Sequence, residues 1–540
     1  MEERPNSSPA RRPIPGGKGP FGGYSWYALG ILIICYLFNY VDRNILSILA
    51  EEVKSDLGLD DAQIGFLYGT AFAVFYAVFG IPFGRLADAW IRKNLIAIGL
   101  FFWSLMTAMT GTARTFGMLG AYRVGVGVGE ASLSPSAYSL IVDYFPQRLR
   151  ATALALYSSG IYLGAAVGFA LGGFIVDFWN GRYPDGSAPL GLAAWQAAFL
   201  AVGLPGLLMA VWVWTLREPA KGQQEGVTIT PTGRPEPFKE FGAVIPPFTV
   251  LSLWRSGCDR KGLLLHAGCT AALALLAWAM VASVGEPAQW IALAIGIYAA
   301  FSWGQGLAYR DPATFGSILG SRAFMYTCVG FASLSFVTNG LAFWTAPLLI
   351  RSFDASPTRV GALMGVGVAV GGWIGVTVGG LVSDRLKQRT PNGRVILGLA
   401  TVVLSVPAMT LMLTATSLAA AFIYFLFTVA LVSLWIGPGA AAANELVPPR
   451  MRSTASAIYL LLNTLIGFAL GPFAVGKISD VLVAAGQSPA DSLRYAMMLS
   501  MLFWAVSAAF LWRARAYVGP AEAALASAGV TGSGSPPDRS

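Results

Sequence analysis

Residues 123–135 read R-V-G-V-G-V-G-E-A-S-L-S-P, and they lie within a segment, from about Phe116 to Ile141, that is otherwise apolar or small. At about 26 residues, this segment is long enough to cross a bilayer as a helix. It carries an arginine and a glutamate at depth. Each such charge costs at least a few kcal/mol in hydrocarbon, so these side chains are expected to face the protein interior or a wet cavity.

The spacing of these two charges supports an inward-facing arrangement. Arg123 and Glu130 are seven residues apart, so they share one helix face about 10 Å apart along the axis. Gly127 lies between them on that face, while Gly125 and Gly129 thin the neighbouring face, where another helix can approach closely. A charged face beside a glycine seam indicates a transport pathway.

The composition indicates an all-α, polytopic membrane protein. The 540 residues are 55% hydrophobic and 12% charged, with a mean hydropathy of +0.62, whereas soluble proteins carry about 25% charged residues. Many apolar runs reach about 18 residues, the length expected of a spanning helix. The net charge of +9 does not indicate nucleic-acid binding, because most Lys and Arg residues fall in short loops on one predicted side of the membrane.

The sequence predicts neither an enzyme nor a metalloprotein. The spacings of Cys35, Cys258, Cys269 and Cys328 match no disulfide or metal framework. His266 is the sole histidine, which excludes a multi-histidine metal site, and we interpret it as an interfacial packing residue. The loops hold no catalytic constellation. With no nucleotide-binding P-loop, ATP is not expected as the energy source, and no cofactor is expected.

Hydropathy predicts fourteen spans in a six-two-six arrangement. They lie at about 24–50, 63–86, 94–113, 116–141, 151–178 and 194–216, then 262–284 and 289–309, then 322–350, 358–382, 394–413, 418–444, 453–478 and 493–514. We therefore predict a cytoplasmic N-terminal tail (1–23), a six-helix bundle (24–216), a cytoplasmic linker (217–261), an inserted transmembrane hairpin (262–309), a second six-helix bundle (310–516) and a disordered cytoplasmic tail (517–540). Basic loops place both termini in the cytoplasm.

An internal repeat relates the two bundles. Residues 143–157 read D-Y-F-P-Q-R-L-R-A-T-A-L-A-L-Y, and residues 445–459 read E-L-V-P-P-R-M-R-S-T-A-S-A-I-Y. The acid, the proline, both arginines, the threonine, an alanine and the tyrosine keep register. Gly84–Asp88 is also similar, less closely, to Gly380–Asp384. Two halves related in this way place a cavity between them near the membrane midplane.

These motifs resemble those of the major facilitator superfamily. Gly84-Arg-Leu-Ala-Asp88 with the following Arg-Lys pair is similar to the signature between its second and third helices, and residues 143–148 are similar to a further pattern. Asn39-Tyr-Val-Asp-Arg43 and residues 123–132 more narrowly resemble the Spinster branch, whose animal members are associated with sphingosine-1-phosphate and lysophospholipids. The resemblance covers roughly residues 24–216 and 320–516, and it does not extend to the inserted hairpin. Short loops and an Ala/Gly/Arg-rich composition suggest a protein of a bacterial inner membrane.

Four charged residues of the first and fourth spans are the principal candidate site. We predict that Asp42 and Glu130 carry protons, and that Arg43 and Arg123 hold an anionic headgroup or take part in gating, because the guanidinium fork suits phosphate and carboxylate. The resemblance implies the same roles. The alternatives are static ion pairs that orient helices, or a place near the interface from which Asp42 and Arg43 snorkel.

The facilitator signature implies that Asp88 serves a conformational switch. Its carboxylate would cap a neighbouring helix N-terminus and pair with Arg148 or Arg150. Asp384 and Arg452 are weaker counterparts in the second half. The alternative is a solvated loop acid that contributes little.

Polar and aromatic residues of other spans are secondary candidates. Asn339 and Asn463 either line the cavity or form interhelical hydrogen bonds. Four aromatic side chains either contact a lipid tail or simply pack: Tyr68, Phe72, Phe343 and Trp435.

The sequence therefore predicts a secondary active transporter that moves an amphipathic, anionic, lysophospholipid- or sphingoid-phosphate-like substrate by alternating access, coupled to protons. We expect a monomer whose partners are its substrate, protons and membrane lipids. A facilitator for other organic anions or drugs is the alternative. A non-transporting receptor or docking protein, with the hairpin as its interface, is a further one.

Overall fold

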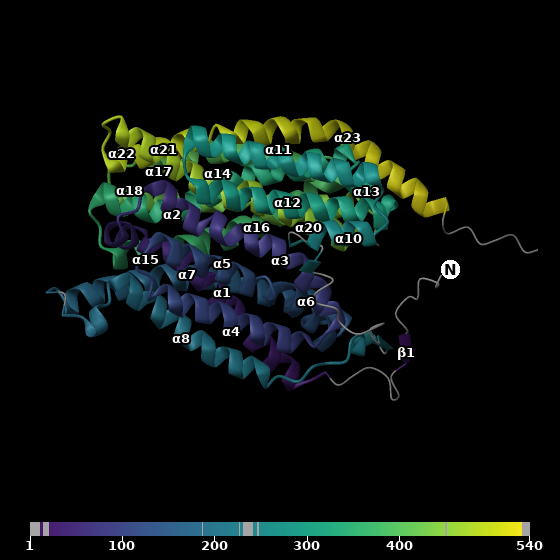
Figure 1. Cartoon of the computed structure of the whole chain (residues 1–540), viewed down its shortest axis with the longest axis horizontal. Coiled ribbons are helices and arrows are strands. Elements are labelled where there is room, and N and C mark those ends of the chain that lie inside the picture. The colour runs from purple at the N-terminus through teal and green to yellow at the C-terminus, as the bar shows by residue number, and fades with distance from the viewer. Residues whose placement is uncertain are drawn as a thin grey trace, which may run out of the picture. The chain divides into compact units, whose positions relative to one another are not determined.

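The computed structural model describes residues 11–13, 21–185, 187–225, 227–229, 241–242, 244–245, 248–448 and 451–531. The chain divides into two compact units (Figure 1). Unit 1 comprises Met1–Arg255, Asp259–Ser302 and Asp354–Gly365. Unit 2 comprises Ser256–Cys258, Trp303–Phe353 and Val366–Ser540.

Unit 1 is built mainly from long helices. They are α1 (Gly23–Leu57), α2 (Asp61–Tyr68), α3 (Thr70–Ala89), α4 (Arg92–Thr110), α5 (Phe116–Glu130), α6 (Leu133–Tyr144), α7 (Gln147–Arg182), α8 (Ala194–Trp214), α10 (Phe248–Arg255), α11 (Arg260–Val284), most of α12 (Pro287–Arg310) and most of α15 (Pro357–Gly367). Short 3₁₀ turns lie at Pro189–Gly191 and Gln223–Glu225. Strands β1 (Arg11–Pro13) and β2 (Val227–Ile229) pair antiparallel, with Arg11 opposite Ile229.

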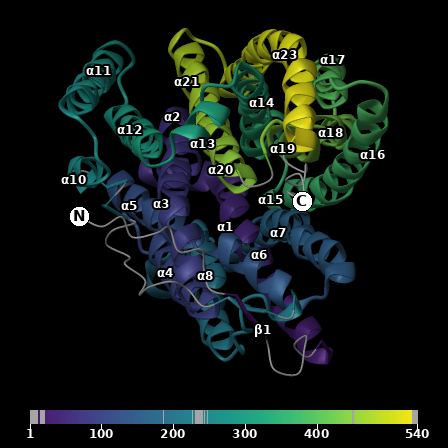
Figure 2. The same cartoon turned by 90° about the vertical axis from the view of Figure 1, so that its right-hand side faces the viewer.

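Unit 2 is also helical. Its helices are α13 (Pro312–Ile318), α14 (Arg322–Phe353), α16 (Trp373–Arg389), α17 (Gly393–Leu413), α18 (Leu418–Val432), α19 (Ile436–Glu445), α20 (Arg452–Leu462), α21 (Leu470–Ala484), α22 (Pro489–Ser500) and α23 (Phe503–Thr531). Two π-helical segments, Val368–Gly372 and Asn463–Ala469, interrupt the second and fifth of its long helical spans. Figure 2 shows α16, α17 and α18 side by side in this unit.

Local sequence signals set several helix ends. Asp60 caps α2 by accepting from the Gln63 amide at 2.7 Å, within a capping box. Thr115 caps α5, and Asp259 caps α11 by accepting from the Gly262 amide at 2.8 Å. Helix α1 ends at Gly58, whose φ of 64° is the left-handed conformation that glycine adopts without strain.

The all-α membrane fold is confirmed, but the count of fourteen spans is not. Within the described ranges, thirteen helices are long and apolar enough to cross a membrane. The predicted span at 116–141 is broken into α5 and α6. Ser132 turns its hydroxyl onto the Gly129 carbonyl at 2.8 Å, and Pro135 has no N–H to continue the helical bonding. The chain therefore bends directly after Glu130.

The predicted disordered tail from residue 517 differs from the structure. Helix α23 continues to Thr531, and its Glu522 forms an ion pair with Lys387 of α16. Alanine and glutamate between residues 520 and 527 favour helix, which explains the extension. The predicted tail beyond residue 531 and most of the predicted N-terminal tail lie outside the described residues. The other domain boundaries stay predictions.

The inserted hairpin consists of α11 and α12, joined at Gly285 and Glu286, which both have positive φ. The two helices are joined to each other and to α10 by polar contacts among His266, Tyr298 and Thr249. His266 Nε2 lies 3.1 Å from the Tyr298 hydroxyl, which also contacts Thr249 of α10. The His266 ring stacks on Phe301 at 5.7 Å. The lone histidine is thus a buried packing residue where α10, α11 and α12 meet.

Glycines allow the helices of unit 1 to pack closely. Gly164 of α7 faces the main chain of α1 at Leu37, and Gly203 of α8 faces the main chain of α4 at Ala108. Gly127 of α5 lies against the Phe72 carbonyl of α3. A methyl group at any of these positions would meet backbone atoms, which cannot rotate away. This packing fixes α5 against its neighbours and so positions its charged residues.

Two substitutions within α5 separate helix propensity from packing. Gly117→Ala adds a methyl group where no atom lies within 4 Å, so it should be neutral or stabilise by up to about 1 kcal/mol. Gly127→Ala gains the same propensity but forces α5 away from α3. We expect a melting temperature several degrees lower for Gly127→Ala in detergent, measured by the loss of monodisperse protein on heating. Equal melting temperatures for the two variants would contradict this packing.

Candidate functional site

The four charged residues predicted from the first and fourth spans meet inside unit 1. Helix α1 supplies Asp42 and Arg43, and α5 supplies Arg123 and Glu130. Arg43 Nε donates to Glu130 Oε2 at 2.7 Å, and Arg123 Nη1 lies 3.6 Å from Asp42 Oδ1. The residues therefore form two interhelical ion pairs, in which each helix contributes one acid and one arginine.

This cluster is buried. Asp42 is 2% exposed, Arg123 1% and Glu130 0%, while the Arg43 side chain is 13% exposed. Buried charges are tolerated only when they are paired, and the two acids and two arginines sum to zero. The alternative of side chains that snorkel to the interface does not match this burial.

Several buried polar atoms of the cluster lack a hydrogen-bond partner among the described residues. The Thr107 hydroxyl donates to Asp42 Oδ2, and Arg123 Nε donates to the Leu67 carbonyl at 3.3 Å. Asp42 Oδ1, Glu130 Oε1 and both terminal nitrogens of Arg123 make no hydrogen bond. Native proteins satisfy most such atoms, so a site with several unsatisfied ones has spare capacity for an anion or a proton.

Aromatic rings surround the arginines. The guanidinium carbon of Arg43 lies 4.6 Å from the ring centroids of Phe72 and Tyr76 and 5.1 Å from that of Tyr40. The Arg123 guanidinium lies 5.5 Å from the Phe72 ring. These distances are in the range of cation–π attraction. Phe72, which the sequence left open between a lipid-tail contact and simple packing, lies beside both cations, and the cluster combines positive charge with aromatic side chains.

Asn339 and Asn463 belong to unit 2, where both have partners within their own helices. Asn339 donates to the Ser335 carbonyl at 2.9 Å and to the Ser335 hydroxyl at 2.8 Å. Asn463 begins the second π-helical segment and donates to the Tyr459 carbonyl at 3.4 Å. A role in lining a cavity stays a prediction for both.

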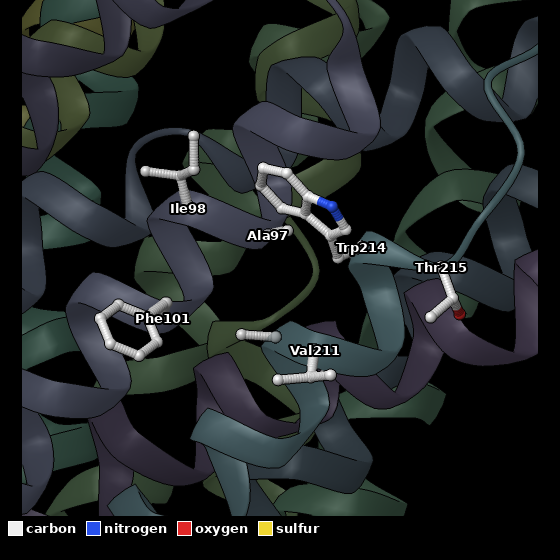
Figure 3. Close-up of a pocket in the computed structure, with 7 residues that line it drawn as sticks. Ala97, Ile98, Phe101, Val211, Trp214 and Thr215 are labelled. Carbon is white, nitrogen blue, oxygen red and sulfur yellow. The ribbon is translucent and has the colours of Figure 1, made fainter.

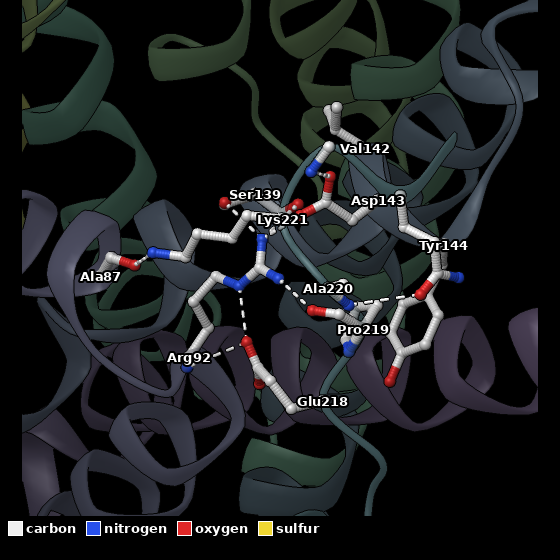
Figure 4. A network of polar contacts seen from close by, with 12 residues as sticks. Ala87, Arg92, Ser139, Val142, Asp143, Tyr144, Glu218, Pro219, Ala220 and Lys221 are labelled. Atoms are coloured by element: carbon white, nitrogen blue, oxygen red, sulfur yellow. Dashed lines mark hydrogen bonds and ion pairs between the residues drawn. The ribbon is translucent and has the colours of Figure 1, made fainter. Parts of the chain in front are cut away.

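A second polar network joins the loops at one end of unit 1 (Figure 4). Its centre is Arg92, the fully buried first residue of α4. Arg92 pairs with Asp143 at the end of α6, donates from Nε to Glu218 at 2.8 Å, and donates from Nη2 to the Pro219 carbonyl at 2.9 Å. The segment that follows α8 is therefore folded back onto the start of α4.

Lys221 and Gly222 complete this network. Lys221 Nζ donates to the Ala87 carbonyl at 2.9 Å and to the Asp88 carbonyl, and the Gly222 amide donates to Asp143 at 2.9 Å. Partial burial and the nearby Arg92 guanidinium lower the pKa of Lys221. The neighbouring carboxylates act in the opposite direction. The end of α3 is thereby tied to the segment after α8.

These contacts differ from the predicted pairing of Asp88. Among the described residues, the ion pairs of this region connect Arg92 to Asp143 and Glu218, rather than Asp88 to Arg148 or Arg150. Arg150 donates to the carbonyls of Val142 and Phe145 at the end of α6. Geometry explains the difference. The Arg92 side chain contacts Asp143 at the end of α6, whereas the Arg150 side chain is directed to main-chain carbonyls a few residues before it in the chain.

Unit 2 contains a corresponding network. Arg394, in the first turn of α17, donates to both carboxylate oxygens of Glu445 at 2.6 and 2.8 Å and to Asp384 at 3.2 Å. Lys387 lies 3.5 Å from Glu445 and pairs with Glu522. The predicted Asp384 thus contacts an arginine, whereas the predicted Arg452 is exposed.

Sequence reasoning missed the centres of both networks. The repeat aligns Asp143 with Glu445, and that register was the available signal, because an acid kept at one position of a duplicated unit suggests one shared contact. Their partners Arg92 and Arg394 both occupy the first turn of the third helix of their half, which precedes the helix that carries the acid. A search for arginine at that position would have found them.

A further missed contact links α7 to α15 within unit 1. The Thr358 amide donates to the Asp177 carboxylate at 2.8 Å, and the Thr358 hydroxyl donates to the Gly173 carbonyl at 3.1 Å. An acid at a helix N-terminus is favourable. Gly361 of α15 also lies against the Phe169 carbonyl. The glycine-rich α7 therefore seats the start of α15.

Known proteins similar to this chain are membrane transporters. An "MFS-type efflux pump" of Mycolicibacterium smegmatis is 24% identical over 85% of this chain and 85% of its own length. "Protein spinster" of Drosophila melanogaster is 22% identical over 89% of this chain and 66% of its own length. The predicted resemblance to Spinster proteins is thereby confirmed.

A solved structure supports the fold. The crystal structure of a bacterial homolog to the human lysosomal transporter Spinster, inward-facing and unoccupied, matches with a TM-score of 0.69 and 24% identity. The match covers 92% of this chain and 98% of that one. The family model of the Major Facilitator Superfamily matches residues 32–472, well over half of the chain. This multi-pass membrane protein therefore belongs to the Major Facilitator Superfamily, a family of transporters rather than enzymes.

Proposed function

We propose that this protein is a proton-coupled secondary active transporter that moves an amphipathic anionic substrate by alternating access. The observation that carries the proposal is the pair of buried ion pairs between α1 and α5, in which several carboxylate and guanidinium atoms make no hydrogen bond. We place the protein as a monomer in a bacterial inner membrane, with both termini in the cytoplasm.

Competition for the arginines couples the substrate to the proton. An anionic headgroup that binds Arg43 takes the place of Glu130, which loses its 2.7 Å partner. A buried carboxylate without a partner costs roughly 3–5 kcal/mol, and protonation removes that cost. Substrate binding at Arg43 and proton binding at Glu130 therefore favour each other. Asp42 and Arg123 form the second exchange pair.

The amphipathic character of the substrate follows from the surroundings of Arg43. Tyr40, Phe72 and Tyr76 provide apolar walls next to the cation, which suits a charged headgroup attached to an apolar chain. The lysophospholipid- or sphingoid-phosphate-like class is proposed from the resemblance to the Spinster branch, whose animal members are associated with such lipids.

Another substrate class has its own support. The similarity to an efflux pump of M. smegmatis extends over most of both chains and favours a facilitator for other organic anions or drugs as the second candidate. Competition binding with lysolipids against small organic anions distinguishes the two. A non-transporting receptor would bind such ligands without moving them into vesicles.

The two arginine networks are proposed as the conformational switch. Each fixes the first turn of the third helix of its half to an acid in the last turn of the fourth helix of that half. Asp88, Arg148 and Arg150 would act at the edge of the first network, and Asp384 and Arg452 at the edge of the second. Asn339 and Asn463 are proposed to line the substrate path.

Neutral variants of the two buried acids test proton coupling. In proteoliposomes, Asp42→Asn and Glu130→Gln should each abolish uptake driven by a pH gradient, because neither side chain can release a proton. Glu130→Gln should retain exchange of substrate at equal pH on both sides, since it imitates the protonated state. Asp185→Asn, which changes an exposed loop acid, is the matched control. Unchanged pH-driven uptake in both variants would remove these residues from the proton role.

A double-mutant cycle separates the stability of the cluster from its function. Arg43→Gln alone leaves Glu130 buried and unpaired, so we expect a loss of roughly 3–5 kcal/mol of stability at neutral pH. Arg43→Gln combined with Glu130→Gln should recover most of that stability, because no charge is left unpaired, yet transport should stay absent. Thermal unfolding and uptake measure the two quantities. Restored transport in the double variant would identify the pair as purely structural.

The role of the first network is tested at Arg92. Arg92→Gln removes contacts to Asp143, Glu218 and the Pro219 carbonyl at once, so uptake should fall at least tenfold while substrate affinity changes little. Arg114→Gln, an exposed arginine of the same unit, serves as control. If Arg92→Gln weakens substrate binding as strongly as it slows uptake, the network belongs to the binding site and not to the switch.

A further inference from the structure

An apolar groove of about 350 Å³ lies on the outer face of unit 1 between α4 and α8 (Figure 3). Ala97 and Ala210 form its floor and are buried, while Ile98, Phe101, Val211 and Trp214 form exposed walls. The groove forms because the two alanines are much smaller than the side chains on either side of them. The volume is at the lower end of the roughly 300–1,000 Å³ typical of ligand pockets.

The groove has the depth of one membrane leaflet. Ala97 and Phe101 follow the start of α4 by about 7 to 14 Å along the helix axis, and Trp214 is the last residue of α8. With the proposed orientation, both helix ends face the cytoplasm. The groove then begins at the level where interfacial tryptophans lie and extends into the hydrocarbon of the cytoplasmic leaflet, whose half of the bilayer is about 15 Å thick.

Two basic residues adjoin the lining of the groove. Lys93 Nζ lies 2.7 Å from the carbonyl of Trp214, a lining residue. Arg217 follows the lining residue Thr215 by two positions, and its exposed side chain has its guanidinium 4.9 Å from the Tyr24 ring of α1. The nearby acid, Glu218, is already engaged by the Arg92 guanidinium and the Lys93 amide. Lys93 and Arg217 therefore present net positive charge beside an apolar channel.

We propose that this groove, with Lys93 and Arg217, binds an anionic phospholipid of the cytoplasmic leaflet. One acyl chain would lie over Ala97 and Ala210, and the phosphate would meet the two cations, because basic side chains near a membrane surface attract anionic lipids. The occupant is a resident bilayer lipid and is distinct from the substrate proposed for the charged cluster of α1 and α5.

Such a lipid would act close to the switch network. Arg217 directly precedes Glu218, and Lys93 directly follows Arg92. A phosphate held by both cations would tie the end of α8 to the start of α4, the same two segments that the Arg92–Glu218 ion pair joins. The lipid composition of the membrane would thereby influence the stability of this end of unit 1.

The test uses the purified full-length protein in detergent, with phosphatidylglycerol or phosphatidylcholine of identical chains added. We expect native mass spectrometry to show phosphatidylglycerol retained at least fivefold better, and the melting temperature to rise more with it. Lys93→Gln should remove most of this preference. Lys261→Gln, an exposed lysine at the start of α11, should keep it.

A second variant tests the apolar channel. Val211→Trp fills the groove from an exposed wall and should reduce retention of both lipids, whereas Val403→Trp, at an exposed position of α17, should not. Ile98→Trp on the opposite wall replaces Val211→Trp if that variant does not elute as monodisperse protein. Equal retention of the two lipids by the unmodified protein, or unchanged retention in the filled variants, would overturn the proposal.

The charged cluster provides the final discrimination. Glu130→Gln should keep the retention and the preference of the unmodified protein, because Glu130 lies in the α1–α5 cluster and not in the groove. Loss of the bound lipid in Glu130→Gln would show that the lipid occupies the proposed substrate site, and the groove assignment would be wrong even though the proposed transport function would stand.

Discussion

Burial of four charges between the helices α1 and α5 is the constraint on which the rest of unit 1 depends. Asp42, Arg43, Arg123 and Glu130 are tolerable there only as interhelical pairs. The pairs require α1 and α5 to hold one register, and the close approach of α5 to α3 at Gly127 helps to fix it. The result is a neutral cluster that any single charge, proton or anion can unbalance.

The internal repeat gives each half a similar ion pair between an arginine and an acid. Arg92 and Arg394 sit in the first turn of the third helix of their half, and each meets an acid, Asp143 or Glu445, that the repeat keeps in register. Each network also includes a further acid. In unit 1 it is Glu218, in the segment after α8, which pairs with Arg92. In unit 2 it is Glu522, in the last part of α23, which pairs with Lys387. The segments between these helices are thereby made part of a folded network, in which charged side chains are paired.

Much of the fold could be predicted from hydropathy, because a helix that crosses hydrocarbon must satisfy its backbone internally and carry an apolar surface. The all-α class and the two long apolar helices α11 and α12 followed from this. The break at Ser132 and Pro135 did not, since hydropathy averages over a window and is insensitive to a single missing N–H. The helix beyond residue 517 was missed because its polar, Ala-rich composition also fits disorder, whereas in the structure the Lys387–Glu522 pair helps to hold it in place.

The residues by themselves determined that Asp42, Arg43, Arg123 and Glu130 must turn inward, because the cost of a bare charge in hydrocarbon depends on residue type and depth alone. Which acid meets which arginine was decided only by the tertiary structure. Long guanidinium side chains can reach along their own helix or across to another, and the distance between helix axes selects the partner. The same reason explains Arg92, whose partners Asp143 and Glu218 lie 51 and 126 residues away and become neighbours only when α6 and the end of α8 converge on α4.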